Sequence, residues 1–214
     1  MNDDLLHRLL APPDDDGRLH GVVIGIVTNN RDPDGLHRVK LRFPWLSESD
    51  ESHWARVATP MAGNDRGCYF LPEVDDEVLV AFEHGSVEHP FVIGSVWNGS
   101  DKPPESNANG SNDHRSIKSR SGHVIRLGDA SGGEKVEIID KTGSNRIVIT
   151  SSDNKIVIEA SGDIEVTSSR GKLKMSAVGI EISSQTDVKI QAQTTIDVSA
   201  NAQLSISGAL VKIN

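Results

Sequence analysis

The chain has 214 residues, a formal net charge of −9 and 4% aromatic residues. Its eight Phe, Trp and Tyr residues all lie before residue 98, and its nine prolines all lie at or before Pro104. This excludes one uniform globular domain, because the second half of the chain lacks the large rings that usually fill such a core. Residues 1–104 hold nine basic and 18 acidic side chains, so nucleic-acid binding through a basic surface is disfavoured.

The first 17 residues are predicted to form a short helix followed by a linker. Four leucines between residues 5 and 10 fall on one face of a helix, and the Pro-Pro-Asp-Asp-Asp-Gly run after them is typical of a linker. The start of the chain is acidic, and no apolar stretch reaches the roughly 18 residues of a membrane-spanning helix. We therefore expect a protein that is made in the cytoplasm without a signal peptide.

Residues 18–100 are predicted to form a small β-barrel of the OB type. Short runs rich in Val, Ile and Phe alternate with turn-forming Gly, Pro, Asn and Asp. In one of these runs Val39, Leu41 and Phe43 fall on one face, with basic residues on the other. Five or six short strands without a helix between them are typical of a closed or nearly closed barrel.

A polar connector is expected at residues 101–121, and a repeat follows at residues 122–214. The repeat unit is a pair of aliphatic residues that flank one residue, and it occurs 11 times at spacings that settle to about eight residues. A fixed period with β-forming residues indicates a solenoid. The pairs are Ile125/Leu127, Val136/Ile138, Ile147/Ile149, Ile156/Ile158, Ile164/Val166, Leu173/Met175, Ile180/Ile182, Val188/Ile190, Ile196/Val198, Leu204/Ile206 and Val211/Ile213.

The predicted fold class is all-β, with the barrel followed by an intertwined trimeric β-helix that forms a needle. Eight residues are too few for a full coil of a single-chain β-helix, but they suit one side of a triangular prism wound from three chains. A single-chain β-helix and an array of hairpins are the alternatives for this segment. The residues predicted to form the trimer core are Ile156, Ile158, Ile164, Val166, Ile180, Ile182, Val188, Ile190, Ile196, Val198, Leu204 and Ile206.

Several motifs, taken in order, resemble the spike family of contractile injection machines, which includes phage baseplate assembly protein V and the C-terminal half of VgrG. The family usually has glycine where this chain has Asp75. The family's large N-terminal hub domains have no counterpart in this sequence, so the hub is expected to be a separate protein. The matching runs are Arg38-Val-Lys-Leu-Arg-Phe-Pro-Trp45, Trp54-Ala-Arg-Val-Ala58, Leu71-Pro-Glu-Val-Asp-Asp-Glu-Val-Leu-Val-Ala-Phe82 and His89-Pro-Phe-Val-Ile-Gly-Ser-Val-Trp-Asn-Gly99.

The resemblance implies a homotrimeric structural spike at the tip of the tail tube, which links hub to tip and punctures the target envelope without enzymatic activity. The expected partners are a trimeric hub protein, tail-tube and baseplate components, and a PAAR-type tip protein that contacts Leu210, Val211 and Ile213. We expect assembly in a phage tail or a tail-like particle, contact with the target membrane only on firing, and no nucleic-acid partner. A trimeric fibre or adhesin is the alternative, and an OB-fold nucleic-acid-binding protein is a less favoured one.

Two sequence patterns that could indicate a binding site are assigned structural roles instead. The run from Gly128 to Lys135 approaches a phosphate-binding loop, but Glu134 stands where the lysine is needed, so we predict a turn between early repeats. The acidic residues and histidines between Asp75 and His89 lack the close spacing of metal ligands. No catalytic residue, metal site or cofactor is predicted.

The cysteine and the tryptophans are also assigned to packing. No nucleophile signature surrounds Cys68, which is predicted to be a buried structural thiol. Trp45, Trp54 and Trp97 could stack on bases in an OB-type protein, but the acidic first half favours core or collar packing for them.

Overall fold

The computed structural model describes residues 18–47 and 49–212. The chain divides into two compact units, Met1–Glu159 and Ala160–Asn214. Apart from the 3-10 turn η1 (Glu83–Gly85), the regular secondary structure of the described residues is β-strand, which confirms the all-β class. The predicted helix and linker at residues 1–17 and the predicted cap contact Ile213 lie outside the described residues.

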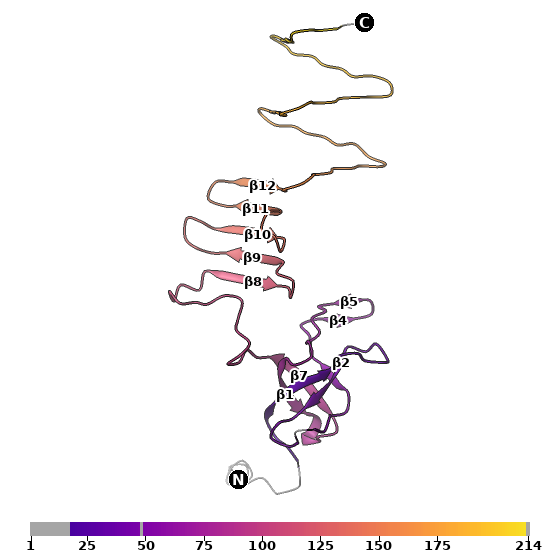
Figure 1. The fold of residues 1–214 in the computed structure, drawn as a ribbon, viewed down its shortest axis with the longest axis vertical. Helices are drawn as coiled ribbons and strands as arrows, with labels where there is room; N and C mark the ends of the chain where they lie inside the picture. Colours follow the sequence, from indigo (N-terminus) through magenta and orange to yellow (C-terminus); the bar gives the residue numbers. More distant parts are fainter. Residues whose placement is uncertain (1–17, 48, 213–214) are drawn as a thin grey trace, which may run out of the picture. The chain divides into compact units, whose positions relative to one another are not determined.

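The first unit contains a closed five-stranded barrel (Figure 1), as predicted. Neighbouring strands are antiparallel except for β3 and β7, which pair in parallel. In spatial order the strands are β1 (Val22–Asn29), β2 (Arg38–Arg42), β3 (Ala55–Val57), β7 (Pro90–Ser95) and β6 (Glu77–Phe82). A separate hairpin is formed by β4 (Ala62–Gly63) and β5 (Arg66–Gly67).

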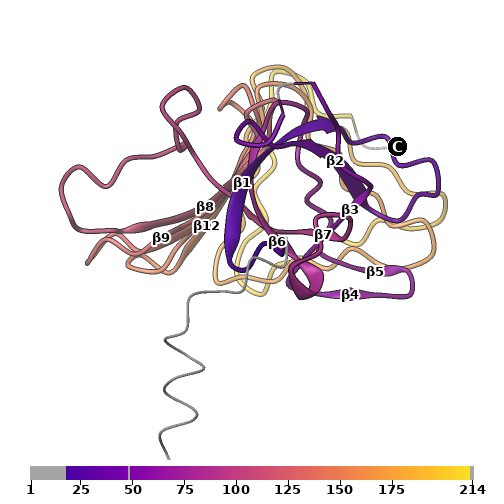
Figure 2. The ribbon, with the colours of Figure 1, turned by 90° about the horizontal axis from the view of Figure 1, so that it is seen from below.

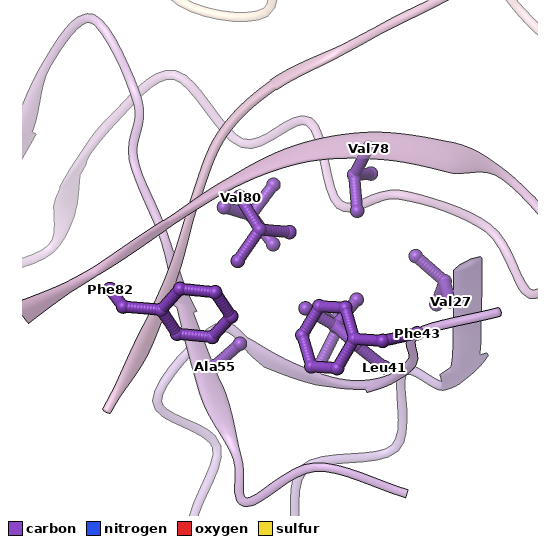
Figure 3. Packing of buried hydrophobic residues seen from close by; sticks show 9 residues of the cluster. Val27, Leu41, Phe43, Ala55, Val78, Val80 and Phe82 are labelled. Atoms are coloured by element: carbon purple, nitrogen blue, oxygen red, sulfur yellow. The ribbon is translucent and has the colours of Figure 1, made fainter. Parts of the chain in front are cut away.

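The barrel core forms because apolar side chains alternate along the strands. Val27 in β1, Leu41 in β2 and Val80 in β6 are fully buried. Figure 3 shows these side chains pointing toward one another, and the rings of Phe43 and Phe82 lie beside them with their centroids 5.5 Å apart. Burial of each such side chain contributes about 1.5–3 kcal/mol, so the alternation that predicts the strands also supplies the core.

A tight turn before β6 holds β1 in place. Asp75 has a φ of 75°, in the left-handed region that glycine adopts most readily. This backbone conformation explains why glycine suits the equivalent position in the family that the sequence resembles. The N–H of Asp75 donates to the carbonyl of Val27 at 2.8 Å, and the N–H of Val27 donates to the carbonyl of Asp76 at 3.0 Å.

A five-stranded antiparallel meander follows in the same unit, in the order β12-β11-β10-β9-β8 (Figure 1). Its strands are β8 (His114–Lys118), β9 (Val124–Gly128), β10 (Lys135–Ile139), β11 (Arg146–Thr150) and β12 (Lys155–Glu159). The first four aliphatic pairs lie in β9 to β12, and consecutive strands of the same chain pair with each other. Over this segment the hairpin alternative is therefore observed, and pairing begins at His114, within the expected connector at 101–121.

Residues with left-handed backbone make the reversals of this meander. Gly132, Gly143 and Asn154 have φ angles of 75°, 74° and 48°, and each lies in a connection between two strands. Asn154 is the last described residue with a positive φ. The four glycines after it, up to Gly208, do not adopt this conformation, so the described chain makes no further turn of this kind.

Residues 160–212, which the structure describes throughout, form no paired strand within the chain. Figure 1 shows an extended trace that winds through successive turns, and in Figure 2 these turns overlie one another. The repeats therefore follow a regular path without a strand partner from their own chain. A single chain does not show the predicted three-chain prism.

Candidate functional site

One face of the sheet β8–β12 consists of exposed aliphatic side chains. The register places Ile125 opposite Ile138 and Leu127 opposite Val136, and both columns continue into the neighbouring strands. Directly opposed residues point to the same side of a sheet, so these nine side chains, 38–67% exposed, share one surface, which we call the aliphatic face. Its members are Ile117, Ile125, Leu127, Val136, Ile138, Ile147, Ile149, Ile156 and Ile158.

The opposite face of the same sheet carries ion pairs around one buried carboxylate, that of Glu137. Arg126 in β9 and Glu137 in β10 are direct cross-strand neighbours, and the guanidinium and carboxylate approach to 3.7 Å. The ammonium group of Lys135 lies 3.1 Å from the Glu137 carboxylate, and Glu137 is only 6% exposed. Opposite charges at the central positions of adjacent strands therefore stabilise this face.

Glu105, from the loop before β8, joins this network. Its carboxylate lies 3.1 Å from the guanidinium of Arg126 and 2.5 Å from Nδ1 of His114. A hydrogen bond from Ser116, with smaller contributions from His114 and Arg126, holds the pKa of Glu105 below its usual value although burial acts in the opposite direction. The loop thus adds ionic contacts to the polar face, whereas the aliphatic face stays exposed in the described part of the chain.

The aliphatic pairs continue through residues 160–212 and are exposed there too. The predicted trimer-core residues of this segment are 51–69% exposed, and the predicted cap contacts Leu210 and Val211 are 75% and 46% exposed. A monomeric soluble protein rarely exposes so long a run of apolar residues, so this segment and the aliphatic face are each a candidate assembly surface. The exposed core residues after Ile158 are Ile164, Val166, Ile180, Ile182, Val188, Ile190, Ile196, Val198, Leu204 and Ile206.

The groups considered for catalysis or metal binding do not form a site. No cluster of three or more His, Cys, Asp and Glu side chains that could hold a metal ion occurs in the described residues. Gly128 ends β9 and Lys135 begins β10, so the run between them is a turn, as predicted. Within residues 18–47 and 49–212, no helix has the length and apolar character needed to cross a membrane.

Cys68 differs from the sequence-based expectation, and two of the tryptophans do not lie in the barrel core. Cys68 is partly exposed rather than buried, and Trp45 and Trp97 are 48% and 67% exposed, outside the barrel core. All three residues follow the end of a strand, so the alternation that buries strand residues does not extend to them. Trp54 is half-buried, with the ammonium group of Lys40 5.7 Å from its ring centroid.

Ion pairs that join the loop between β1 and β2 to the start of β2 were not predicted from the sequence. The Arg38 guanidinium donates to the Asp32 carboxylate at 2.6 and 2.8 Å and to Asp34 at 2.5 Å. The hydrogen bond between Arg38 and Asp32 lowers the pKa of Asp32 and raises that of Arg38. The Asp-Pro-Asp-Gly run just before β2 is the sequence signal for these ion pairs, because it places two carboxylates near an arginine.

Comparison with known proteins assigns the barrel to a class. The family described as the type VI secretion system/phage-baseplate injector OB domain matches residues 23–97, which span β1 to β7. The barrel region, about a third of the chain, therefore matches an injector OB domain.

The relatives are VgrG spike proteins. The chain is 35% identical over 101 residues to the type VI secretion system spike protein VgrG3 of Vibrio cholerae, covering 45% of this chain and 10% of that protein. It is 30% identical over 150 residues to the spike protein VgrG1b of Pseudomonas aeruginosa (68% of this chain, 19% of that protein) and 30% identical over 139 residues to VgrG1a (63% and 21%). The matched region is thus at most about a fifth of each relative.

Proposed function

We propose that this chain is the structural central spike of a contractile injection machine and that it acts as a homotrimer. The observation that carries the proposal is the aliphatic face, whose side chains are 38–67% exposed on a sheet whose other face holds ion pairs around the buried Glu137 carboxylate. Three copies that turn their aliphatic faces toward a common axis would bury all of these side chains at once. Each would then contribute about 1 kcal/mol or more to assembly.

The repeats after residue 160 extend the same arrangement into a needle. Residues 160–212 have no strand partner in the described part of the chain, and unpaired backbone groups need partners once they are buried. In a prism wound from three chains, each strand would pair with strands of the other copies above and below it. The prism would thereby supply the missing hydrogen bonds and enclose the aliphatic pairs.

The proposed action is mechanical rather than enzymatic. Contraction of the sheath would drive the needle through the target envelope, while the barrels form a collar that connects the needle to the hub. The match of residues 23–97 to the injector OB domain supports this place in the machine. Strands that are all paired across chains resist unfolding under load, as stacked strands do in cross-β structures.

The partners in this proposal are a separate trimeric hub, tail-tube and baseplate components, and a PAAR-type tip protein. The tip protein would contact Leu210, Val211 and Ile213, and the exposure of the first two, 75% and 46%, supports this contact. Removal of residues 204–214 should leave the trimer intact and weaken capture of the tip protein in a pull-down. Unchanged capture would contradict the proposed contact.

The solution mass tests the central claim. Light scattering of the purified full chain should give about three times the chain mass of 23.1 kDa. A monodisperse species of one chain mass would overturn the proposed spike, because one chain leaves its repeats without strand partners.

A further inference from the structure

Five charged residues alternate in sign along the needle segment. Each stands between the two members of an aliphatic pair, in five consecutive repeats. We call them the charge ladder. They are Glu165, Lys174, Glu181, Lys189 and Asp197.

The central position of a pair faces away from the aliphatic side of the strand, because successive residues point to opposite faces. Thr167, which is two residues further along, donates a hydrogen bond to Glu165 at 3.0 Å, so both side chains lie on the same side. No ion pair joins two ladder residues within the described chain. The ladder residues therefore carry charges on the outer side that do not pair with one another within the described residues.

The meander shows what such charges do when strands are stacked. Arg126 and Glu137 stand at the central positions of the pairs in β9 and β10, and they form an ion pair directly across the two strands. Here the neighbouring strand belongs to the same chain, because the chain reverses at a turn that contains Gly132 with a φ of 75°. After Asn154 no described residue has a positive φ, so a strand's neighbour has to be supplied in another way.

We propose that the charge ladder forms ion pairs between chains and fixes the register of the three strands in the needle. The proposal rests on the homotrimer proposed above. A chain that winds around a three-sided prism moves to the next side with every repeat, so the strand stacked above it on one side comes from another copy. Glu181 of one copy would then lie about 4.8 Å from Lys189 of the next copy, measured along the stack.

The alternation makes a shifted register unfavourable. The aliphatic pairs are nearly equivalent from repeat to repeat, so a chain shifted by one repeat would bury nearly the same apolar side chains. Such a slip would place like charges next to each other, for example Glu181 beside Asp197 or a second Glu181, and like charges directly opposite each other are destabilising. The ladder thus selects one register among several with similar apolar contacts.

A second set of charged residues on the outer side supports the same register. Asp163 precedes the pair Ile164/Val166, and Lys172 precedes the pair Leu173/Met175. Both residues have the same orientation as the ladder residue that follows them two positions later. Stacking in the proposed register would place these opposite charges together in adjacent layers.

A disulfide experiment tests the register directly. In the full chain with Cys68→Ser, the pair Glu181→Cys and Lys189→Cys should give a covalent trimer on a non-reducing gel after oxidation. The reason is that each Cys at 181 would lie beside the Cys at 189 of the next copy, at a spacing that a disulfide can bridge. The control pair Glu181→Cys and Asp197→Cys lies two layers apart, about 9.6 Å, and should remain uncrosslinked.

The outcomes separate this inference from the proposed function. If light scattering shows no trimer for the Cys68→Ser chain, the homotrimer itself fails. If the trimer forms but the 181/189 pair gives no covalent trimer, or the 181/197 pair is the one that crosslinks, the trimer stands and the proposed register is wrong.

Charge reversal provides a second measurement with a matched control. Lys189→Glu would face Glu181 and Asp197, whereas Lys212→Glu occupies the same position of a later repeat, next to the neutral Ser205. Lys189→Glu should lower the midpoint of thermal trimer dissociation by about 2–4 °C more than Lys212→Glu, and added salt should reduce the difference. Reversal of all five ladder charges keeps the alternation and should restore the midpoint. Equal shifts for the two single variants would contradict the ladder.

Discussion

The sheet at residues 114–159 and the repeats at residues 160–212 carry the same aliphatic pairs but form different structures. In the sheet, turns with left-handed residues such as Gly143 and Asn154 fold the chain back on itself. In the later repeats such turns are absent among the described residues, and the strands stay unpaired within one chain. The comparison shows that the same aliphatic pattern occurs in paired and in unpaired segments, and that left-handed turns accompany pairing within the chain.

Hydrogen exchange should give the largest difference between the two segments. At concentrations where the trimer dissociates, amides of β9 to β11 should stay protected, because their partners belong to the same chain. Amides of residues 160–212 should exchange freely and become protected only in the trimer. Protection of these residues in the monomer would mean that the comparison is wrong.

A carboxylate on the aliphatic side of a needle strand should prevent assembly. Ile182→Asp would bury three unpaired carboxylates in one layer of the trimer, each at a cost of several kcal/mol. Light scattering should then show monomers or unfinished assemblies. The control Ser183→Asp adds the same charge on the outer side of the same strand and should leave the trimer intact, so equal behaviour of the two variants would invalidate the inward assignment.

The sequence predicts the barrel and the buried side of each strand because both depend on local alternation. Val39, Leu41 and Phe43 alternate with basic residues and are buried as expected. Whether a repeat pairs with a strand of its own chain is harder to predict from the sequence. The pairs Ile147/Ile149 and Ile180/Ile182 have the same pattern, but only the first lies in a paired strand. The useful signal is in the connections, where Gly132 and Gly143 accompany the longer spacing of 11 residues. The ionic contacts of Glu105 depend on a loop conformation that local patterns do not specify.

Loss of the ion pair between Arg126 and the buried Glu137 carboxylate should weaken the sheet without affecting the needle register. Arg126→Ala removes one of the two cations beside Glu137, which is 6% exposed. We expect a loss of about 1–3 kcal/mol in the free energy of unfolding, measured by denaturant titration. Arg146→Ala is a suitable control, because Arg146 pairs with Glu159 where both side chains are nearly half exposed, and its loss should cost less than about 1 kcal/mol.

Acid should loosen the loop that carries Glu105. Its pKa is lowered in the folded chain, mainly by the hydrogen bond from Ser116, so its contribution to stability is present above the ordinary glutamate pKa and is lost as the pH falls through the folded value. Wild-type protein should therefore lose more stability than Glu105→Gln when the pH drops below about 4.3. Thermal midpoints of both proteins at several pH values check this, and parallel curves would count against the assigned role of Glu105.

The smallest effect is expected in the barrel, at the turn before β6. Asp75→Gly relieves a side chain from a φ of 75° and should raise the stability of the barrel by up to about 1 kcal/mol. Asp75→Val should lower it, because a β-branched residue is strained in this conformation. Neither variant should change needle protection in hydrogen exchange, which would separate barrel stability from needle assembly.

The end of the left-handed turns at Asn154 also imposes an order on folding. Hairpins join residues close in sequence, so the sheet can fold within one molecule on a time scale of about microseconds. In the proposed trimer, the needle strands have to wait for an encounter of three chains, and that step slows with dilution. Once the sheets have associated, the tethered repeats meet at an effective concentration of about millimolar. Closure of the needle is then expected to proceed as a zipper from the sheet toward its far end.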